Sequence, residues 1–238
     1  MSLFFIGCSH TYGDDLADPV TQAWPSLIAD AKNKSFVNLA VSGGTNDRTV
    51  YHTIKNSSLH DHYYIAWTYI ERFTRYRSEN NFEINFNPQL TNGIYGNDPE
   101  FVDYGKLHYA YWYNNLYAFK NWLQQIILVQ RYLESKNKSY TMINSCPNNI
   151  NRWTSDCNLF NNNVKLLLCF DIMDDDQLQA EHKEIESLLG EIDLTHYLGW
   201  GNWCIADLLK IYPAGPTNHL LEQGHQAVAD YILTHDTH

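Results

Sequence analysis

The sequence predicts an α/β fold in which a central parallel sheet is covered by helices on both faces. Two observations carry this prediction. Short apolar runs alternate along the chain with segments of helical periodicity, and no internal repeat or low-complexity linker interrupts that alternation. The length of 238 residues and the 44% of hydrophobic residues suit one globular domain, which we expect to span residues 1–238.

The first half of the chain predicts three strands joined by two helices. The strands are expected at residues 2–7, 35–41 and 63–67. The helices are expected at residues 14–33 and from residue 47 to about residue 55. Pro19 and Pro25 interrupt the first helical pattern, because proline lacks the N–H that a helix interior needs.

The second half of the chain is less regular. Residues 72–105 are polar and rich in Asn, Pro and Gly, which is typical of a functional loop or an insertion. Residues 107–136 predict one long helix, because apolar side chains recur at three- and four-residue steps. A fourth strand and a terminal helix are expected at residues 140–143 and 223–234. Within the ambiguous segment 148–200, residues 165–172 fit either a strand or a helix.

The loops that follow the strands are expected to lie at one rim of the sheet. In parallel α/β sheets, ligands bind beyond the carboxyl ends of the strands. This rule places the turns at Ser9, Gly43, Thr68 and Ser145 together. We therefore look for functional residues in these four turns.

The charge and the cysteines limit the partners and the compartment. The formal net charge of −11 argues against nucleic acid or an anionic membrane surface as the main partner. The five cysteines are odd in number and widely spaced, so we expect free thiols in a reducing compartment. The segment Leu3–Cys8 ends like a lipoprotein signal but lacks a basic region before a long apolar stretch. No run of 18 apolar residues is present, and we expect a cytoplasmic protein.

Two histidine-rich segments suggest metal ligands at first sight. His60-Asp61-His62 precedes a predicted strand, where alternation puts both imidazoles on one face, yet two side chains do not complete a site. His235-Asp236-Thr237-His238 lies in a terminal tail. We therefore predict no metal, and nothing in the sequence indicates another cofactor.

The most informative segment is the turn after the first predicted strand. The apolar run ends in Gly7-Cys8-Ser9-His10, and a strand that breaks into a glycine-containing turn can present a serine nucleophile. Serines in such turns also commonly cap helices. The partners of Ser9 therefore decide its interpretation.

Three short blocks, spread over most of the chain, resemble the SGNH, or GDSL-type, hydrolase family. Gly7-Cys8-Ser9-His10 is similar to the Gly-Asp-Ser-Leu block, and Asn38-Leu39-Ala40-Val41-Ser42-Gly43 is similar to the second block. His219, which precedes a predicted helix, matches the histidine of the last block. The resemblance implies a flavodoxin-like three-layer sandwich with a central parallel sheet and an irregular insertion around 72–105.

The resemblance also implies roles for three residues. Ser9 corresponds to the nucleophile, His219 to the general base and acid, and the Gly43 amide to an oxyanion donor. The chemistry suits these residue types, because an imidazole must take the proton of a serine hydroxyl and a preorganised N–H must meet the oxyanion.

The sequence departs from the family pattern at three positions. Cys8 replaces the aspartate of the first block, and Pro216 stands where the family has its triad aspartate. The asparagine of the third block is missing after the third predicted strand, so Thr68 or Asn46 is left to supply a donor. A Ser-His dyad oriented by a backbone carbonyl, or by a distant acid such as Asp207, remains chemically workable.

Several further residues are candidates with ordinary structural alternatives. His225 competes with His219 but falls inside the predicted helix, and Gly43 can serve only as a tight turn. His10, Asn46, Thr68 and Arg72 are candidate substrate-binding residues. His10 would point away from Ser9 in an extended backbone, and Glu71-Arg72 is either a binding pair or a surface salt bridge. Aromatic residues between 104 and 117 are interpreted as core plus a cleft wall, with an oligomer contact or plain core as alternatives.

We therefore expect a serine ester hydrolase that forms an acyl-enzyme on Ser9. The resemblance implies a small or carbohydrate-borne ester as the substrate. The runner-up is a catalytically degenerate protein that keeps the fold for binding or structure. A transferase that passes the acyl group to an acceptor other than water is a third interpretation.

Overall fold

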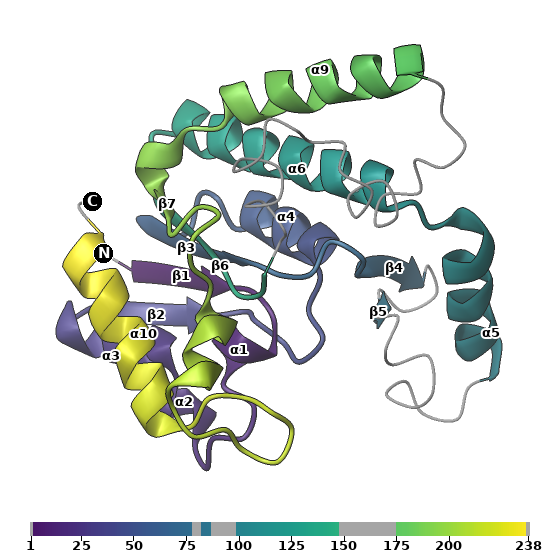
Figure 1. Cartoon of the computed structure of the whole chain (residues 1–238). Helices are drawn as coiled ribbons and strands as arrows, with labels where there is room; N and C mark the ends of the chain where they lie inside the picture. Colours follow the sequence, from purple (N-terminus) through teal and green to yellow (C-terminus); the bar gives the residue numbers. More distant parts are fainter. Residues whose placement is uncertain (1, 78–81, 87–98, 148–174, 237–238) are drawn as a thin grey trace.

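A computed structural model describes residues 2–77, 82–86, 99–147 and 175–236 (Figure 1). These residues form a five-stranded parallel sheet in the order β2-β1-β3-β6-β7. The strands are β1 (Ser2–Ile6), β2 (Ser35–Asn38), β3 (His62–Trp67), β6 (Ser139–Asn144) and β7 (Tyr197–Leu198). The second strand lies outside the first and the later strands add on the other side, which is the flavodoxin-like order. The predicted α/β fold is confirmed.

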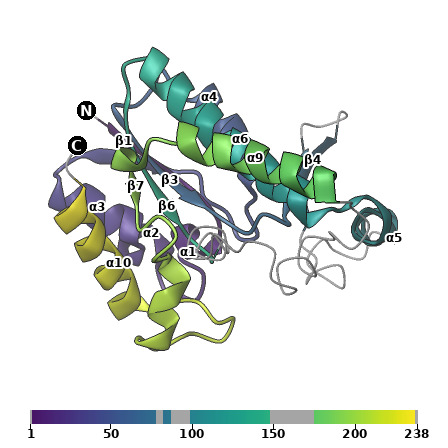
Figure 2. The same ribbon diagram turned by 45° about the horizontal axis from the view of Figure 1, so that its top comes forward.

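Helices cover both faces of this sheet, as Figures 1 and 2 show. One face carries α2 (Pro19–Gln22), α3 (Trp24–Ala31) and α10 (Glu222–His235). The other carries α4 (Asn46–Lys55), α6 (Asn115–Ser135) and α9 (Asp175–Glu191). All residues of β3 are buried, as expected of a strand that is covered on both faces.

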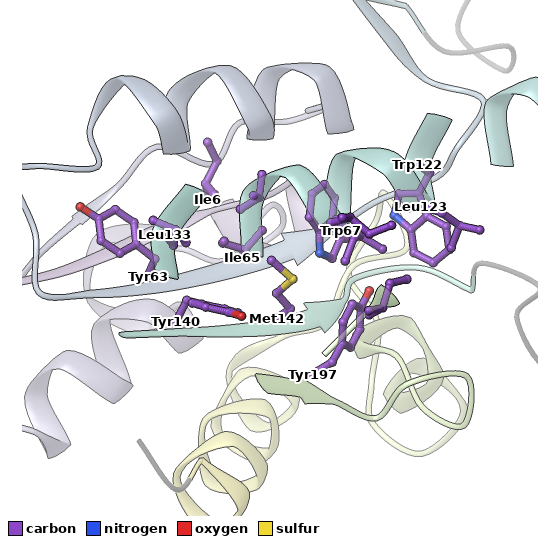
Figure 3. Packing of buried hydrophobic residues seen from close by; sticks show 14 of the residues in the cluster. Ile6, Tyr63, Ile65, Trp67, Trp122, Leu123, Leu133, Tyr140, Met142 and Tyr197 are labelled. Atoms are coloured by element: carbon purple, nitrogen blue, oxygen red, sulfur yellow. The ribbon is translucent and has the colours of Figure 1, made fainter. Parts of the chain in front are cut away.

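The core is divided by the sheet into two clusters. Alternate residues of β3 point to opposite faces, so Tyr63, Ile65 and Trp67 contact the α6 side (Figure 3). On this side they pack with Trp122 and Leu123 of α6. The packing fixes β3 at the centre of the sheet, and the carboxyl end of β3 therefore has a fixed position.

The predicted helix over residues 14–33 is instead a turn followed by two helices. Pro19 and Pro25 do not interrupt a helix but lie in the first turns of α2 and α3. Proline suits these positions because the N–H groups there have no partner within the helix. The second strand is also shorter than predicted and ends at Asn38, whose side-chain oxygen accepts a hydrogen bond from the Ala40 N–H.

The insertion holds regular structure that the sequence did not predict. An antiparallel pair, β4 (Phe73–Arg77) and β5 (Phe82–Phe86), is followed by α5 (Pro99–Leu107). The helix expected over 107–136 is present as α6, but it begins only at Asn115. A π-helical turn over His108–Trp112 precedes it, and Asn114 caps α6 by accepting a hydrogen bond from the Tyr117 N–H.

Several of the aromatic residues between 104 and 117 are exposed, contrary to their interpretation as core. Tyr111, Trp112 and Tyr117 are 79%, 78% and 69% exposed. Tyr109 is the exception: it packs on the small cluster around Phe73, and its hydroxyl donates a hydrogen bond to the Glu71 carbonyl. This region therefore contacts the end of β3 through Tyr109.

The last third of the chain adds elements to both layers. The strand expected at 140–143 is β6, and the terminal helix expected at 223–234 is α10, so both predictions are confirmed. The ambiguous segment contributes α9 and β7, whereas residues 165–172 lie outside the described residues. Among the helices that are described, none combines the length and the apolar character needed to cross a membrane.

The packing of α6 against β3 gives a first prediction. We expect Leu123→Ala to lower the free energy of unfolding by about 2–5 kcal/mol, because the Leu123 side chain is fully buried and its loss leaves a cavity. Leu128→Ala in the same helix is the matched control, since Leu128 is 48% exposed and should cost about 1 kcal/mol or less. Urea unfolding followed by circular dichroism measures both. Equal losses would contradict the assigned inner face of α6.

Candidate active site

Ser9 lies beyond the carboxyl end of strand β1. The strand ends at Ile6, and Ser9 is the first residue of the short helix α1 (Ser9–Tyr12). Ser9 is 5% exposed. The backbone is helical here and not extended, so the condition under which His10 would point away from Ser9 is not met.

The imidazole of His219 meets the hydroxyl of Ser9. The distance from His219 Nε2 to Ser9 Oγ is 2.7 Å, a short hydrogen bond between residues 210 positions apart. His225, the competing histidine, lies inside α10, and its Nδ1 accepts a hydrogen bond from the Trp24 N–H. Burial, followed by the charges of His10 and His219, lowers the pKa of His225 to about 4. His219 is therefore the imidazole that contacts Ser9.

The far side of His219 faces a carboxylate that the sequence did not indicate. His219 Nδ1 lies 2.9 Å from Thr217 Oγ1 and 3.7 Å from Asp15 Oδ2. Asp207, the acid suggested from sequence, is engaged elsewhere: its carboxylate accepts hydrogen bonds from the Cys204 N–H and from Lys210 Nζ. Asp15 therefore takes the place that was considered for Asp207.

Asp15 also fixes the backbone that carries His219. The same oxygen, Oδ2, accepts hydrogen bonds from the Thr217 N–H at 2.9 Å and from the His219 N–H at 3.2 Å. Gly215 leaves room for this approach, since a Cβ there would lie 2.4 Å from the Asp15 Cβ. No local pattern in the sequence shows the contact, because it joins residues 204 positions apart.

The hydrogen bonds shift the protonation of Asp15. Burial alone would raise the pKa of its carboxyl, but donors on Thr217 and His219 and the His219 charge outweigh that effect. The pKa of Asp15 therefore lies below its usual range. The carboxylate is the form that holds the turn Gly215–His219.

The loop after β2 packs against the Ser9 turn and forms the other side of the site. Gly43 has a φ of 68°, a left-handed conformation that favours glycine, and the next residue, Gly44, touches the turn itself. A Cβ at Gly44 would lie 2.5 Å from the Gly7 carbonyl oxygen and 3.2 Å from the Cys8 Cα. The loop after β2 therefore lies directly against the residue that precedes Ser9.

Asn46 and Thr68 are brought together at the same rim. The Asn46 side chain pairs with the Thr68 backbone in both directions: Oδ1 accepts from the Thr68 N–H at 2.9 Å, and Nδ2 donates to the Thr68 carbonyl at 3.2 Å. Both residues are buried. The Asn46 amide therefore serves to join the loop after β2 to the end of β3.

Arg72 reaches back over this pairing. Its Nη1 donates to Thr68 Oγ1 at 3.1 Å and, more weakly, to the Gly44 carbonyl at 3.4 Å. Its guanidinium lies 4.9 Å from the centre of the Tyr69 ring. Arg72 is therefore part of the rim and not half of an ordinary surface salt bridge.

Cys8 and Cys146 lie buried beneath this rim as free thiols. A hydrogen bond from Cys146 holds the pKa of Cys8 below its usual range. Burial opposes that shift, whereas His10 and Arg72 reinforce it. Burial, and secondarily Cys8, raises the pKa of Cys146. Of these two thiols, Cys8, which is next to Ser9, therefore has the lower pKa.

His10 lies on the inner side of the candidate dyad. Its ring centre is 4.8 Å from that of His219, and burial is the main cause that lowers the pKa of His10. A neutral imidazole is therefore favoured beside His219. Because the His10 side chain is 8% exposed, it contacts the protein interior more than the solvent.

The described residues contain no cluster of three or more His, Cys, Asp or Glu side chains arranged to hold a metal ion. His62, one of the two histidines considered from sequence, directs its Nδ1 at Ser139 Oγ and its Nε2 at Thr141 Oγ1. Its partner in the motif, His60, directs its Nδ1 at Ser2 Oγ. Both histidines of this motif therefore contact hydroxyl groups.

Comparisons with known proteins give similar structures but no similar sequence. No family model matches the sequence, and no curated protein matches it. One similar solved structure is a lipolytic protein of the G-D-S-L family from Veillonella parvula, at TM-score 0.43 and 14% identity over 98% of this chain and 96% of that chain. Another is a putative lipolytic protein of that family from Desulfitobacterium hafniense, at TM-score 0.47 and 13% identity over 98% of both chains. A third is the esterase EstA from a Pseudoalteromonas species, at TM-score 0.46 and 9% identity over 99% of this chain and 96% of that chain.

The contact of Gly44 with the Ser9 turn gives a second prediction. We expect Gly44→Ala to lower the free energy of unfolding by about 1–3 kcal/mol, because the new Cβ meets backbone atoms that cannot rotate away. Gly190→Ala in α9 is the matched control, since a Cβ there meets nothing within 4 Å and should leave stability unchanged or raise it by up to about 1 kcal/mol. Chemical unfolding measures both. A neutral Gly44→Ala would refute the tight packing of the two loops.

Asp15 gives a third prediction, on acid stability. A carboxyl whose pKa is lowered by folding stabilises the fold above its unfolded pKa, and that stability is lost as the pH falls through the folded pKa. Asp15→Asn should therefore lower the free energy of unfolding by about 1–3 kcal/mol at pH 7, and the difference from wild type should shrink at about pH 3. Urea midpoints across that range measure it. Asp14→Asn alters the neighbouring carboxylate, which Ser42 contacts, and should not reproduce this pattern.

Proposed function

We propose that the protein is a serine ester hydrolase in which Ser9 is the nucleophile and His219 the general base and acid. The single observation that supports this most is the 2.7 Å hydrogen bond between Ser9 Oγ and His219 Nε2. A serine hydroxyl becomes a useful nucleophile when an imidazole is in position to take its proton.

The groups beyond His219 support the tautomer that this role needs. When Ser9 donates to Nε2, the other ring nitrogen carries the proton and points at Thr217 Oγ1, 2.9 Å away. The Thr217 hydroxyl can in turn donate to the Asp15 carboxylate, which its hydrogen bond stabilises. Asp15 and Thr217 thus act as a pair that orients the ring and favours the imidazolium formed when Ser9 attacks.

Two backbone donors support an oxyanion hole at the same rim. In the described part of the chain, neither the Ser9 N–H nor the Gly43 N–H has an acceptor. Ser9 is the first residue of a helix, where N–H groups lack intrahelical partners. We assign these two N–H groups to the carbonyl oxygen of the bound ester, on which negative charge develops during the attack.

The reaction then follows in two balanced steps. Ser9 Oγ attacks the ester carbonyl as its proton passes to His219. The tetrahedral intermediate collapses, and the alcohol leaves with that proton. Water next attacks the acyl-Ser9 as His219 takes its proton. The bond between Ser9 Oγ and the acyl group then breaks, the carboxylic acid leaves and the proton returns from His219 to Ser9. We propose a small or carbohydrate-borne ester as the substrate class. If the acceptor is another alcohol, the same acyl-enzyme would make the protein a transferase.

A serine-directed fluorophosphonate tests the proposal. We expect it to label the wild type and Ser42→Ala, a control at a neighbouring turn, but not Ser9→Ala. Hydrolysis of 4-nitrophenyl acetate should fall roughly 10³-fold or more in Ser9→Ala and in His219→Asn. His225→Asn should keep its activity, because His225 does not contact Ser9.

Two results would count against the proposal. Labelling that survives in Ser9→Ala would mean that another residue is the nucleophile. A wild type that neither reacts with the probe nor cleaves a panel of acetyl and short-chain esters would favour the degenerate binding protein.

A further inference from the structure

The oxyanion side of the candidate site lacks one donor that the resemblance leads one to expect. The Asn46 side chain is fixed on the Thr68 peptide through both Oδ1 and Nδ2, which leaves only its second Nδ2 hydrogen unassigned. The Thr68 hydroxyl accepts a hydrogen bond from Arg72 and also lies 3.9 Å from Cys146 Sγ. Arg72 is therefore the residue at this rim with the most donors left over.

Arg72 lies where three loops converge. Its Nη1 contacts Thr68, after β3, and Gly44, after β2. Gly44 in turn lies against Gly7 and Cys8, the two residues before Ser9. The guanidinium therefore lies at the carboxyl ends of β1 and β3, in contact with the loop that carries Gly43.

The guanidinium has unused hydrogen-bonding capacity. It carries five N–H donors, and its Nε is buried without an acceptor in the described part of the chain. Arg72 forms no ion pair with a described carboxylate. Burial raises the pKa of the neighbouring Glu71, and the charge of Arg72 only partly opposes that shift. A buried cationic donor without a partner is costly, and an anionic group arriving at the site would satisfy it.

The charge of Arg72 acts on the residues next to Ser9. The guanidinium is among the groups that lower the pKa of Cys8, and it also lowers the pKa of His10, whose shift is caused mainly by burial. Cys8 and His10 flank Ser9 in the sequence. The positive charge is thus felt on both sides of the candidate nucleophile.

We propose that Arg72 is a catalytic residue that contacts the ester and stabilises the oxyanion, in the place of the asparagine that the chain lacks. The inference rests on the proposed function. When Ser9 attacks, the π electron pair of the carbonyl moves to oxygen, and Arg72 meets that charge while staying protonated. On collapse the electron pair returns and the alcohol leaves, so Arg72 gives up no proton at either step.

The test compares Arg72→Gln and Arg72→Lys with Arg75→Gln, a neighbouring exposed arginine that lies over the Phe73 ring. On neutral 4-nitrophenyl acetate, we expect kcat to fall about 10²- to 10³-fold in Arg72→Gln with KM changed less than about threefold. The kcat of Arg72→Lys should fall less, because lysine keeps the positive charge but lacks the planar set of N–H donors. The rate of fluorophosphonate labelling should fall in parallel, and Arg75→Gln should match the wild type.

A second variant separates catalysis from folding. Added guanidinium chloride at millimolar concentration should restore part of the activity of Arg72→Ala, because the free cation can occupy the vacated position. A purely structural role predicts no such rescue, and its absence would overturn the proposal even where the variant is less stable.

An anionic ester provides the remaining arm. One contrary result is that Arg72→Gln raises KM for the 4-nitrophenyl hemisuccinate only, and that kcat on the acetate stays unchanged. That result would mean that Arg72 binds a substrate carboxylate and that the oxyanion role is wrong. Unchanged kinetics on both esters would also overturn it. Both outcomes differ from failure of the proposed function, in which the wild type itself is neither labelled at Ser9 nor active.

Discussion

The carboxylate of Asp15 is the constraint on which the candidate site depends. One oxygen accepts the N–H groups of Thr217 and His219, and it lies 3.7 Å from the far nitrogen of the imidazole. These contacts attach the turn before α10 to the segment that follows Ser9. The turn is also closed by a hydrogen bond from the Gly215 N–H to the His219 carbonyl. Asp15 and the turn's own backbone together hold His219 Nε2 2.7 Å from Ser9 Oγ.

This arrangement shows how a required geometry can be reached from a different place in the chain. The resemblance leads one to expect an acid three residues before His219, where Pro216 stands. Proline cannot accept a proton or a hydrogen bond through its side chain, so the acid has to come from elsewhere. Asp15 approaches because Gly215 presents no side chain at that point. An oriented imidazole therefore depends on the position of a carboxylate in space and not on its place in a motif.

The parts of the protein that could be predicted are those set by local sequence. Ser9 and Gly43 follow strands that the sequence predicts, so strand and turn patterns sufficed to place them at one rim. Asp15 could not be found in this way, because its contact with His219 spans 204 positions and depends on tertiary packing. The start of the helix predicted over 107–136 was wrong for another reason. Apolar periodicity continues through the π-helical turn at His108–Trp112, and periodicity does not register a change in backbone hydrogen bonding.

The separation between Ser9 and His219 has a consequence for folding. The two residues come from opposite ends of the chain, 210 positions apart, and α10 follows directly after the histidine. Closing a loop of this length carries an entropic cost, which the packing of α10 on the sheet must offset. The Ser9–His219 hydrogen bond therefore depends on the docking of α10. A chain in which α10 is not docked has Ser9 without its imidazole partner.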